Sequence, residues 1–180
     1  MYHMKYVLLG DSGVGKSAIL WQFTQVQYQT LGIDYASRTL NRARIHIWDI
    51  AGMPRFRPIV PLYTHSATVI VLVYDIGNRD SYDTIQHYWL PRLHTGTKQT
   101  LVLVGNKVYG PRVVSFEEGQ LLSMKRNIMF YEVCDSSVDQ VFLESSRYVL
   151  DKIDNGVLLP AYFTELGIRY ESNVNSRCCP

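Results

Sequence analysis

A glycine-rich run near the beginning of the chain has the residue types and the spacing that bind phosphate. Residues 10–17 read Gly-Asp-Ser-Gly-Val-Gly-Lys-Ser and fit the pattern G-x-x-x-x-G-K-[ST]. Glycines let the backbone curl so that successive N–H groups point at an anion, and Lys16 adds a compact positive charge. The Ser17 hydroxyl is an oxygen ligand of the kind that Mg²⁺ prefers. The residues expected to contact a nucleoside triphosphate here are Gly10, Ser12, Gly13, Val14, Gly15, Lys16, Ser17 and Ala18.

The elements that must hold this loop are predicted to be alternating strands and helices. Nearly continuous apolar runs are typical of strands that helices cover on both faces. Such runs occupy residues 6–9, 45–48, 69–74, 101–104 and 128–133. Residues 34–40 and 43–49 are separated only by Asn41 and Arg42, which predicts a hairpin with one antiparallel edge strand. We therefore expect an α/β fold with an open, mostly parallel sheet.

Two helices show end signals as well as periodicity. Ser115 followed by Glu118 predicts a capping box at the beginning of one helix. A second helix closes the domain, and Gly156 is expected to end it. The apolar face of this closing helix is expected to consist of Val138, Phe142, Val149 and Ile153.

Length and composition limit the other function classes. A chain of 180 residues predicts one domain, over residues 1–154, followed by a flexible tail over residues 155–180, in which 158–163 can dock back. The net charge of +2 is too small to indicate a nucleic-acid partner. The longest apolar run, residues 69–74, falls far short of the ~20 residues of a membrane-spanning helix.

The order and identity of several motifs resemble a Rab-type small GTPase of the Ras superfamily over about residues 4–154. Residues 30–35 resemble its switch I, residues 48–52 the Mg²⁺ motif that follows its second long strand, and Asn106-Lys107 its guanine-recognition loop. Three further stretches resemble those that distinguish Rab proteins from other branches. They are residues 55–60, 63–67 and 72–76. The resemblance implies a P-loop fold with a six-stranded sheet and helices on both faces.

The resemblance also implies a set of roles for the nucleotide site. GTP or GDP is the expected ligand, with Mg²⁺ held by Ser17, Thr30 and Asp49, although an Asp after an apolar strand is also a common turn cap. Lys16, Thr30 and Gly52 are expected to handle the γ-phosphate during hydrolysis. The base is expected to meet Asn106 and Lys107, together with Cys134 and Asp135 from a second loop.

Two of the positions that depart from the family pattern bear directly on hydrolysis and on base specificity. Met53 occupies the place of the catalytic glutamine, and a thioether cannot orient the attacking water, so slow hydrolysis is expected. Tyr109 occupies the place of the guanine-specifying aspartate, which puts the preference for guanine over adenine in question; Asp135 either replaces that carboxylate or is a solvated loop residue. The alternatives are a non-hydrolysing interaction module, a P-loop protein with relaxed base specificity, and a small-molecule kinase, for which no acceptor site or arginine-bearing lid is found.

The resemblance further implies protein partners and attachment to a membrane. Effector proteins are expected to contact Ile33, Tyr35, Trp48 and Tyr63, whose aromatic members are also candidates for core packing. An exchange factor and a GTPase-activating protein are expected as regulators.

The two C-terminal cysteines are the candidate sites for lipid attachment. Cys178 and Cys179 do not fit C-a-a-X, but the pair resembles the Rab tail that prenylation machinery modifies with two lipid chains. This predicts attachment to the cytosolic face of a membrane, and the alternative is a pair of free thiols.

Overall fold

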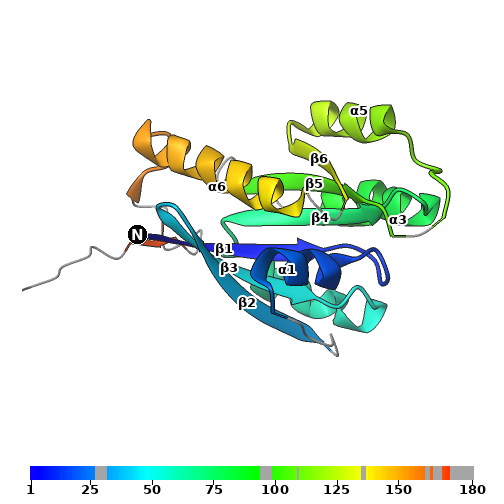
Figure 1. The fold of residues 1–180 in the computed structure, drawn as a ribbon, viewed down its shortest axis with the longest axis horizontal. Coiled ribbons are helices and arrows are strands. Elements are labelled where there is room, and N and C mark those ends of the chain that lie inside the picture. Colours follow the sequence, from blue (N-terminus) through cyan, green and yellow to red (C-terminus); the bar gives the residue numbers. More distant parts are fainter. Residues whose placement is uncertain are drawn as a thin grey trace, which may run out of the picture.

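A computed structural model describes residues 1–26, 32–93, 99–108, 110–134, 137–160, 163 and 168–170 (Figure 1). The strands are β1 Tyr2–Leu9, β2 Ile33–Leu40, β3 Ala43–Ile50, β4 Val69–Asp75, β5 Thr100–Asn106, β6 Met129–Val133 and β7 Arg169–Tyr170. They form one sheet in the order β2-β3-β1-β4-β5-β6, and β7 pairs with β1. The predicted α/β fold is confirmed.

The direction of the strands follows the sequence pattern, with one addition. β1, β3, β4, β5 and β6 pair in parallel, while β2 and β3 form the predicted antiparallel hairpin. Its turn places Asn41 at φ +49°, a left-handed conformation that asparagine tolerates better than most residues. The expected six strands omit β7, which pairs antiparallel with β1 and has only two residues, too few for any periodic signal.

Helices cover both faces of the sheet, so the central strands are apolar on both sides (Figure 1). One face carries α1 Lys16–Thr24 and α6 Val138–Asp154. The opposite face carries the remaining helical segments. They are η1 Pro54–Ile59, α2 Val60–Thr64, α3 Arg79–Thr84, η2 Ile85–Trp89, α4 Leu90–Arg92 and α5 Phe116–Arg126.

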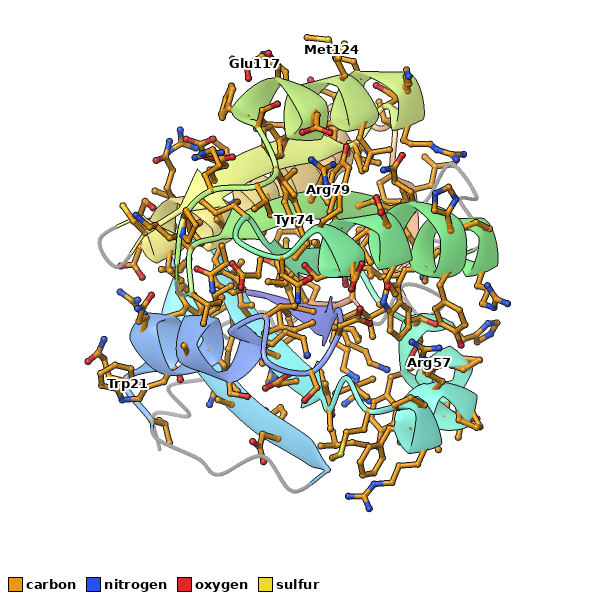
Figure 2. All side chains as sticks on the ribbon, turned by 90° about the vertical axis from the view of Figure 1, so that its right-hand side faces the viewer. Trp21, Arg57, Tyr74, Arg79, Glu117 and Met124 are labelled. Carbon is orange, nitrogen blue, oxygen red and sulfur yellow. The ribbon has the colours of Figure 1, made fainter. Side chains whose placement is uncertain are left out.

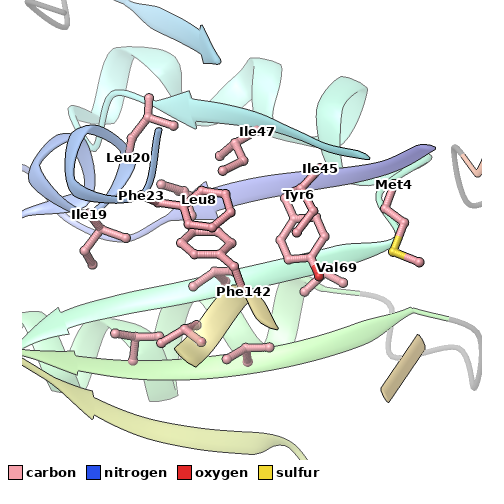
Figure 3. Packing of buried hydrophobic residues seen from close by; sticks show 14 of the residues in the cluster. Met4, Tyr6, Leu8, Ile19, Leu20, Phe23, Ile45, Ile47, Val69 and Phe142 are labelled. Atoms are coloured by element: carbon pink, nitrogen blue, oxygen red, sulfur yellow. The ribbon is translucent and has the colours of Figure 1, made fainter. Parts of the chain in front are cut away.

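Aromatic packing joins α1 and α6 to the sheet (Figure 3). The rings of Phe23 and Phe142 stack with centroids 4.0 Å apart, and Tyr6 lies 5.7 Å from Phe142. All three side chains are fully buried, and the Tyr6 hydroxyl is satisfied by the Ser145 hydroxyl at 3.0 Å. This packing holds the C-terminal end of α1 against the sheet, and the phosphate loop precedes the other end of the same helix.

The end signals of α5 and α6 are confirmed. The Ser115 hydroxyl accepts the Glu118 N–H, and the Glu118 carboxylate accepts the Ser115 N–H, which completes the capping box. After α6, Gly156 adopts φ +68°, and the N–H groups of Gly156 and Val157 donate to the carbonyls of Ile153 and Lys152. This is the Schellman arrangement, in which glycine is favoured.

Removing the charge of Glu118 is expected to lower stability in a pH-dependent way. Arg79 forms two hydrogen bonds to the Glu118 carboxylate and lowers its pKa to about 2 (Figure 2 labels Arg79 between α3 and α5). A carboxylate with a lowered folded-state pKa stabilises the fold above its unfolded pKa, and that stabilisation is lost as the pH falls toward 2. The Glu118 side chain is 39% exposed, so solvent screens the pair and Glu118→Gln is expected to cost about 1 kcal/mol at pH 7.

Urea unfolding at pH 7, 5, 4 and 3 measures this effect. The difference between Glu118→Gln and the unchanged protein should shrink below pH ~4.5, close to the unfolded pKa of a glutamate. Glu117→Gln, on the exposed side of the same helical turn, is the control and should change stability by only a few tenths of a kcal/mol. A difference for Glu118→Gln that is independent of pH would contradict this assignment.

The segment after α6 returns to the core, first within residues 158–163, where docking is expected, and again at residues 168–170. Leu158 and Ile168 are buried in the same core as Phe142, and Phe163 packs against that core with its ring 6.1 Å from Tyr2. These residues pack into the core on the side of the sheet that carries α6, and β7 pairs with β1. The remaining residues, 171–180, lie outside the described part of the chain.

No helix in the described ranges is both long enough and apolar enough to cross a membrane.

Candidate functional site

The phosphate loop follows β1 and leads directly into α1, as its sequence predicts. Gly10, Gly13 and Gly15 have φ values of +147°, +83° and +90°, which L side chains rarely adopt. A Cβ on Gly10 would also lie 2.1 Å from the carbonyl oxygen of Val73. The glycines therefore permit a backbone path that other residues would strain, and this path delivers the chain to the N-terminus of α1, where unpaired N–H groups favour an anion.

Lys16 folds back over this loop. Its ammonium donates to the carbonyl oxygens of Gly10 at 3.0 Å and Asp11 at 2.7 Å, and the residue is only 6% exposed. Burial lowers the pKa of Lys16, while the nearby carboxylates of Asp49 and Asp11 act in the opposite direction. The loop thus holds a cation beside the helix N-terminus, ready to pair with phosphate oxygens.

Ser17 and Asp49 meet at the other side of Lys16. The Ser17 hydroxyl donates to Asp49 Oδ2 at 2.6 Å, and Asp49, the second-last residue of β3, is completely buried. A hydroxyl and a carboxylate are hard oxygen donors, so this pair fits the Mg²⁺ that accompanies nucleotide phosphates. When bound, Mg²⁺ supplies positive charge beside the phosphates. The structure thus gives Asp49 contacts suited to metal binding.

Gly52 closes the site from the segment that follows β3. A Cβ on Gly52 would lie 2.3–2.4 Å from backbone atoms of Asp11, Gly10 and Ser12, so its backbone rests directly on the phosphate loop. Together these elements surround a cavity of about 230 Å³. Its lining consists of Ser12, Gly13, Gly15, Lys16, Ser17, Ala18, Asp49, Ala51, Gly52 and Met53. Most of the predicted phosphate residues therefore share one cavity with Met53, whereas Gly10 and Val14 do not line it.

The candidate base loop is tied to the phosphate loop. Asn106, at the end of β5, donates from Nδ2 to the carbonyl oxygen of Val14 at 3.0 Å. A Cβ on Gly15 would lie 2.1 Å from the same Nδ2 atom, so glycine is needed for this approach. In the second loop, the Cys134 N–H already donates to the Ser137 hydroxyl at 3.1 Å. Asn106 is thus placed to link base and phosphate binding, whereas the Cys134 N–H has an internal acceptor.

A comparison with known families agrees with this geometry. The family model described as Ras family matches residues 5–151. The chain belongs to the Ras family. It is thus a small GTP-binding switch protein; members of this family generally bind GTP and GDP, typically with Mg²⁺, hydrolyse GTP, and interact with effectors, exchange factors and GTPase-activating proteins.

Several predicted residues of this Ras-family chain lie outside the described ranges. They are Thr30, Tyr109, Asp135, Cys178 and Cys179. Their assignments to the metal, the base and the lipid anchor stay predictions. Lys107 lies within the described residues, directly after β5.

Two residues that the sequence does not single out also contribute to the site of this Ras-family protein. Asp75 ends β4 beside Asn106, and its Oδ1 accepts the N–H groups of Gly77 at 2.8 Å and Val108 at 3.5 Å. Asp75 therefore supports the beginning of the base loop. The only signal for it in the sequence is a carboxylate at the end of a buried strand next to β5.

Arg57, from η1, connects three parts of the molecule (Figure 2). Its Nη2 lies 3.7 Å from Asp11 Oδ1 in the phosphate loop, and its guanidinium lies 4.0 Å from the ring centroid of Tyr88 in η2. The guanidinium of Arg92 also lies 4.0 Å from the centroid of the Tyr88 ring. These contacts hold η1 between the phosphate loop and the helical run that begins at α3.

The residues predicted to meet effectors gather on one surface. The rings of Tyr35 and Trp48 lie 5.0 Å apart, and the Lys5 ammonium lies 5.3 Å from the Trp48 ring and 5.6 Å from the Tyr63 ring. Tyr35 is 44% exposed, while Trp48 and Tyr63 are half-buried. Ile33 packs against the core beneath α2 and α3. The aromatic trio of Tyr35, Trp48 and Tyr63 is therefore partly packed against the protein and partly exposed to a partner.

Proposed function

We propose that this Ras-family protein is a Rab-like switch that hydrolyses GTP slowly, rests mostly with GTP bound, and recruits effectors in membrane trafficking. The proposal of slow hydrolysis rests on Met53, which lines the same cavity as Lys16, Ser17 and Gly52. The support for the Rab branch is the sequence resemblance given above, together with the aromatic trio on one surface.

The retained residues account for nucleotide binding. Lys16 places a positive charge next to the phosphate loop, and the N-terminus of α1 offers N–H groups to the phosphates. Ser17 and Asp49 would hold Mg²⁺. Gly52 lies on the phosphate loop without room for a side chain, so a γ-phosphate in the cavity would contact its backbone. Loss of that phosphate on hydrolysis would release this contact and that of Thr30, which is the switching step.

The residues that follow account for slow hydrolysis. A glutamine side chain can donate to and accept from a water molecule, whereas the Met53 thioether is only a weak acceptor. Pro54 begins η1 and Pro58 lies within it, so this segment has fewer backbone conformations available than one without proline. Water in the cavity would therefore lack the group that orients it for attack.

Restoring the glutamine is expected to accelerate hydrolysis. Met53→Gln should raise the single-turnover rate of GTP hydrolysis by about 10-fold or more, because a positioned hydrogen-bonding side chain typically contributes 10²–10⁴ in such steps. The matched control is Leu62→Gln, an exposed position on α2. An unchanged rate in Met53→Gln, or equal acceleration in Leu62→Gln, would contradict this role for Met53.

A non-hydrolysing interaction module is the second candidate, because the same Met53 observation favours it. The two candidates predict different rates of phosphate release by the unchanged protein. A slow switch releases phosphate from bound GTP at a measurable rate over hours, and an interaction module releases none. Adding a soluble extract that contains GTPase-activating proteins should accelerate only the slow switch, since such proteins supply an arginine in trans.

Membrane attachment through Cys178 and Cys179 is the remaining part of the proposal. Two lipid chains provide durable attachment, whereas one chain gives only marginal binding. Intact-mass measurement of the protein isolated from its own cells should show two added prenyl groups, and Cys178→Ser/Cys179→Ser should show none. An unmodified mass for the unchanged protein would contradict the predicted membrane attachment.

A further inference from the structure

Three side chains from three strands form a hydrogen-bonded chain next to the aromatic trio. The Tyr35 hydroxyl lies 2.6 Å from His46 Nδ1, and His46 Nε2 lies 2.9 Å from His3 Nδ1. The rings are nearly parallel, at 17° between Tyr35 and His46 and 20° between the two imidazoles. Strand register explains the contact, since Lys5 pairs with His46 and His3 pairs with Arg44 in neighbouring strands, so these side chains share one face of the sheet.

This chain of hydrogen bonds can accept one proton without losing a bond. In the neutral form, Tyr35 O–H donates to His46 Nδ1 and His46 Nε2–H donates to His3 Nδ1. Uptake of one proton reverses both bonds: the proton on His46 Nε2 passes to His3 Nδ1, the Tyr35 proton passes to His46 Nδ1, and the added proton restores the Tyr35 hydroxyl. His3 Nδ1–H then donates to His46 Nε2, and His46 Nδ1–H donates to the Tyr35 oxygen. A second proton would leave two N–H groups facing each other. The hydrogen bonds between Tyr35, His46 and His3 can therefore accommodate one added proton.

The other charged groups that the described strands present on this face are positive. Lys5 and Arg44 project from β1 and β3, and Arg169 of β7 is paired with His3. Tyr63 of α2 and Ser66, which follows that helix, approach Lys5. Burial lowers the pKa of Lys5, which indicates that this region already disfavours positive charge. Among the described residues that β1, β2, β3 and β7 present on this face, none is acidic.

We propose that this face, made of His3, Lys5, Tyr35, Arg44 and His46, binds an acidic protein segment and takes up a proton when it does so. The cations of this face would attract a carboxylate of the partner, and a carboxylate within a few ångströms of an imidazole favours its protonated form. Binding that takes up a proton becomes tighter as the pH falls through the ordinary histidine pKa of about 6.5.

This inference rests on the proposed function in one respect: the face continues the surface assigned to effectors, since Tyr35 belongs to both. It adds the chemistry of the partner and a dependence on pH. The aromatic rings of Tyr35 and Trp48 would contact apolar side chains of the partner, and the cationic part would select acidic residues beside them.

The test uses the full chain and a rhodamine-labelled peptide of eight glutamates, with affinity measured by fluorescence anisotropy at pH 7.5 and pH 6.0 and equal ionic strength. Glutamate stays ionised over this range, so a change in affinity reports on the protein. The unchanged protein is expected to bind the peptide about fivefold more tightly at pH 6.0, the size of one additional exposed ion pair. His3→Gln/His46→Gln should show less than a twofold change.

The matched control is His87→Gln, at an exposed position on η2, which should behave like the unchanged protein. Thermal unfolding of the double variant shows whether it is folded, and Lys5→Met provides a second variant that should weaken peptide binding at both pH values. Absence of peptide binding, equal affinity at the two pH values, or retention of the pH effect in the folded double variant would overturn the proposal.

Guanine-nucleotide content measured on the same samples separates this proposal from the proposed function. His3 and His46 do not line the nucleotide cavity, so the double variant should retain its nucleotide. Loss of the pH effect with nucleotide bound would refute only the acidic-partner face. Absence of nucleotide with the pH effect intact would refute only the GTP switch.

Discussion

Lys16→Ala is expected to lower the affinity for GTP and GDP by about 100-fold or more. The Lys16 ammonium is buried and is held by the carbonyls of Gly10 and Asp11, so its charge is fixed next to the position of the phosphates. Hydrogen bonds to charged groups contribute about 1.5–3 kcal/mol each, and removing one partner of a buried charge pair costs about 3–5 kcal/mol. Fluorescence titration with a labelled guanine nucleotide measures the change.

Lys152→Ala is the matched control for this experiment. Lys152 lies near the end of α6, where its ammonium stacks over the Tyr148 ring at 4.4 Å, away from the cavity. This variant should bind nucleotide like the unchanged protein. Because Lys16 also donates to two carbonyls, circular dichroism is needed to show that Lys16→Ala is folded. A folded Lys16→Ala protein with unchanged nucleotide affinity would show that the phosphate loop does not bind nucleotide as described.

Gly52→Ala is expected to weaken nucleotide binding by at least about 10-fold and to destabilise the protein by about 1–3 kcal/mol, the usual cost of overpacking a tight site. The added methyl group would meet backbone atoms of Asp11, Gly10 and Ser12 at 2.3–2.4 Å, and backbone cannot rotate away as a flexible side chain does. The phosphate loop must therefore shift away from Gly52. Urea unfolding and nucleotide titration measure the two effects.

Gly32→Ala provides the matched control, since it adds the same methyl group a short distance away. At Gly32 the new Cβ would lie 3.7–3.8 Å from the Phe56 ring, which is ordinary van der Waals contact. Both stability and nucleotide affinity should change little. If Gly52→Ala and Gly32→Ala behave alike, the close contact between Gly52 and the phosphate loop is not important for the site.

Much of the fold follows from local patterns in the sequence. The apolar strands, the hairpin at Asn41 and the capping box at Ser115 each depend on residues near one another in the chain, so their physical causes are visible there. The phosphate loop is predictable for the same reason, because its glycines, Lys16 and Ser17 are consecutive. Gly52 and Asp49 could be assigned only through the resemblance to a family, since their partners are more than thirty residues away.

The features that the sequence does not predict depend on contacts between distant elements. β7 has two residues and is stabilised by pairing with β1 and by burial of Ile168, so it has no pattern of its own. Arg57 gains its role only because η1 packs beside Asp11 and Tyr88. The hydrogen bond between His3 and His46 joins residues 43 positions apart and requires the register of β1 with β3.

The most direct test of the account is to identify the nucleotide that copurifies with the unchanged full-length protein. The protein is purified without added nucleotide and denatured, and the released nucleotide is identified by mass and counted per chain. The account predicts close to one guanine nucleotide per chain, with GTP exceeding GDP because Met53 slows hydrolysis. Release of ATP, or of no nucleotide from a folded protein, would contradict it.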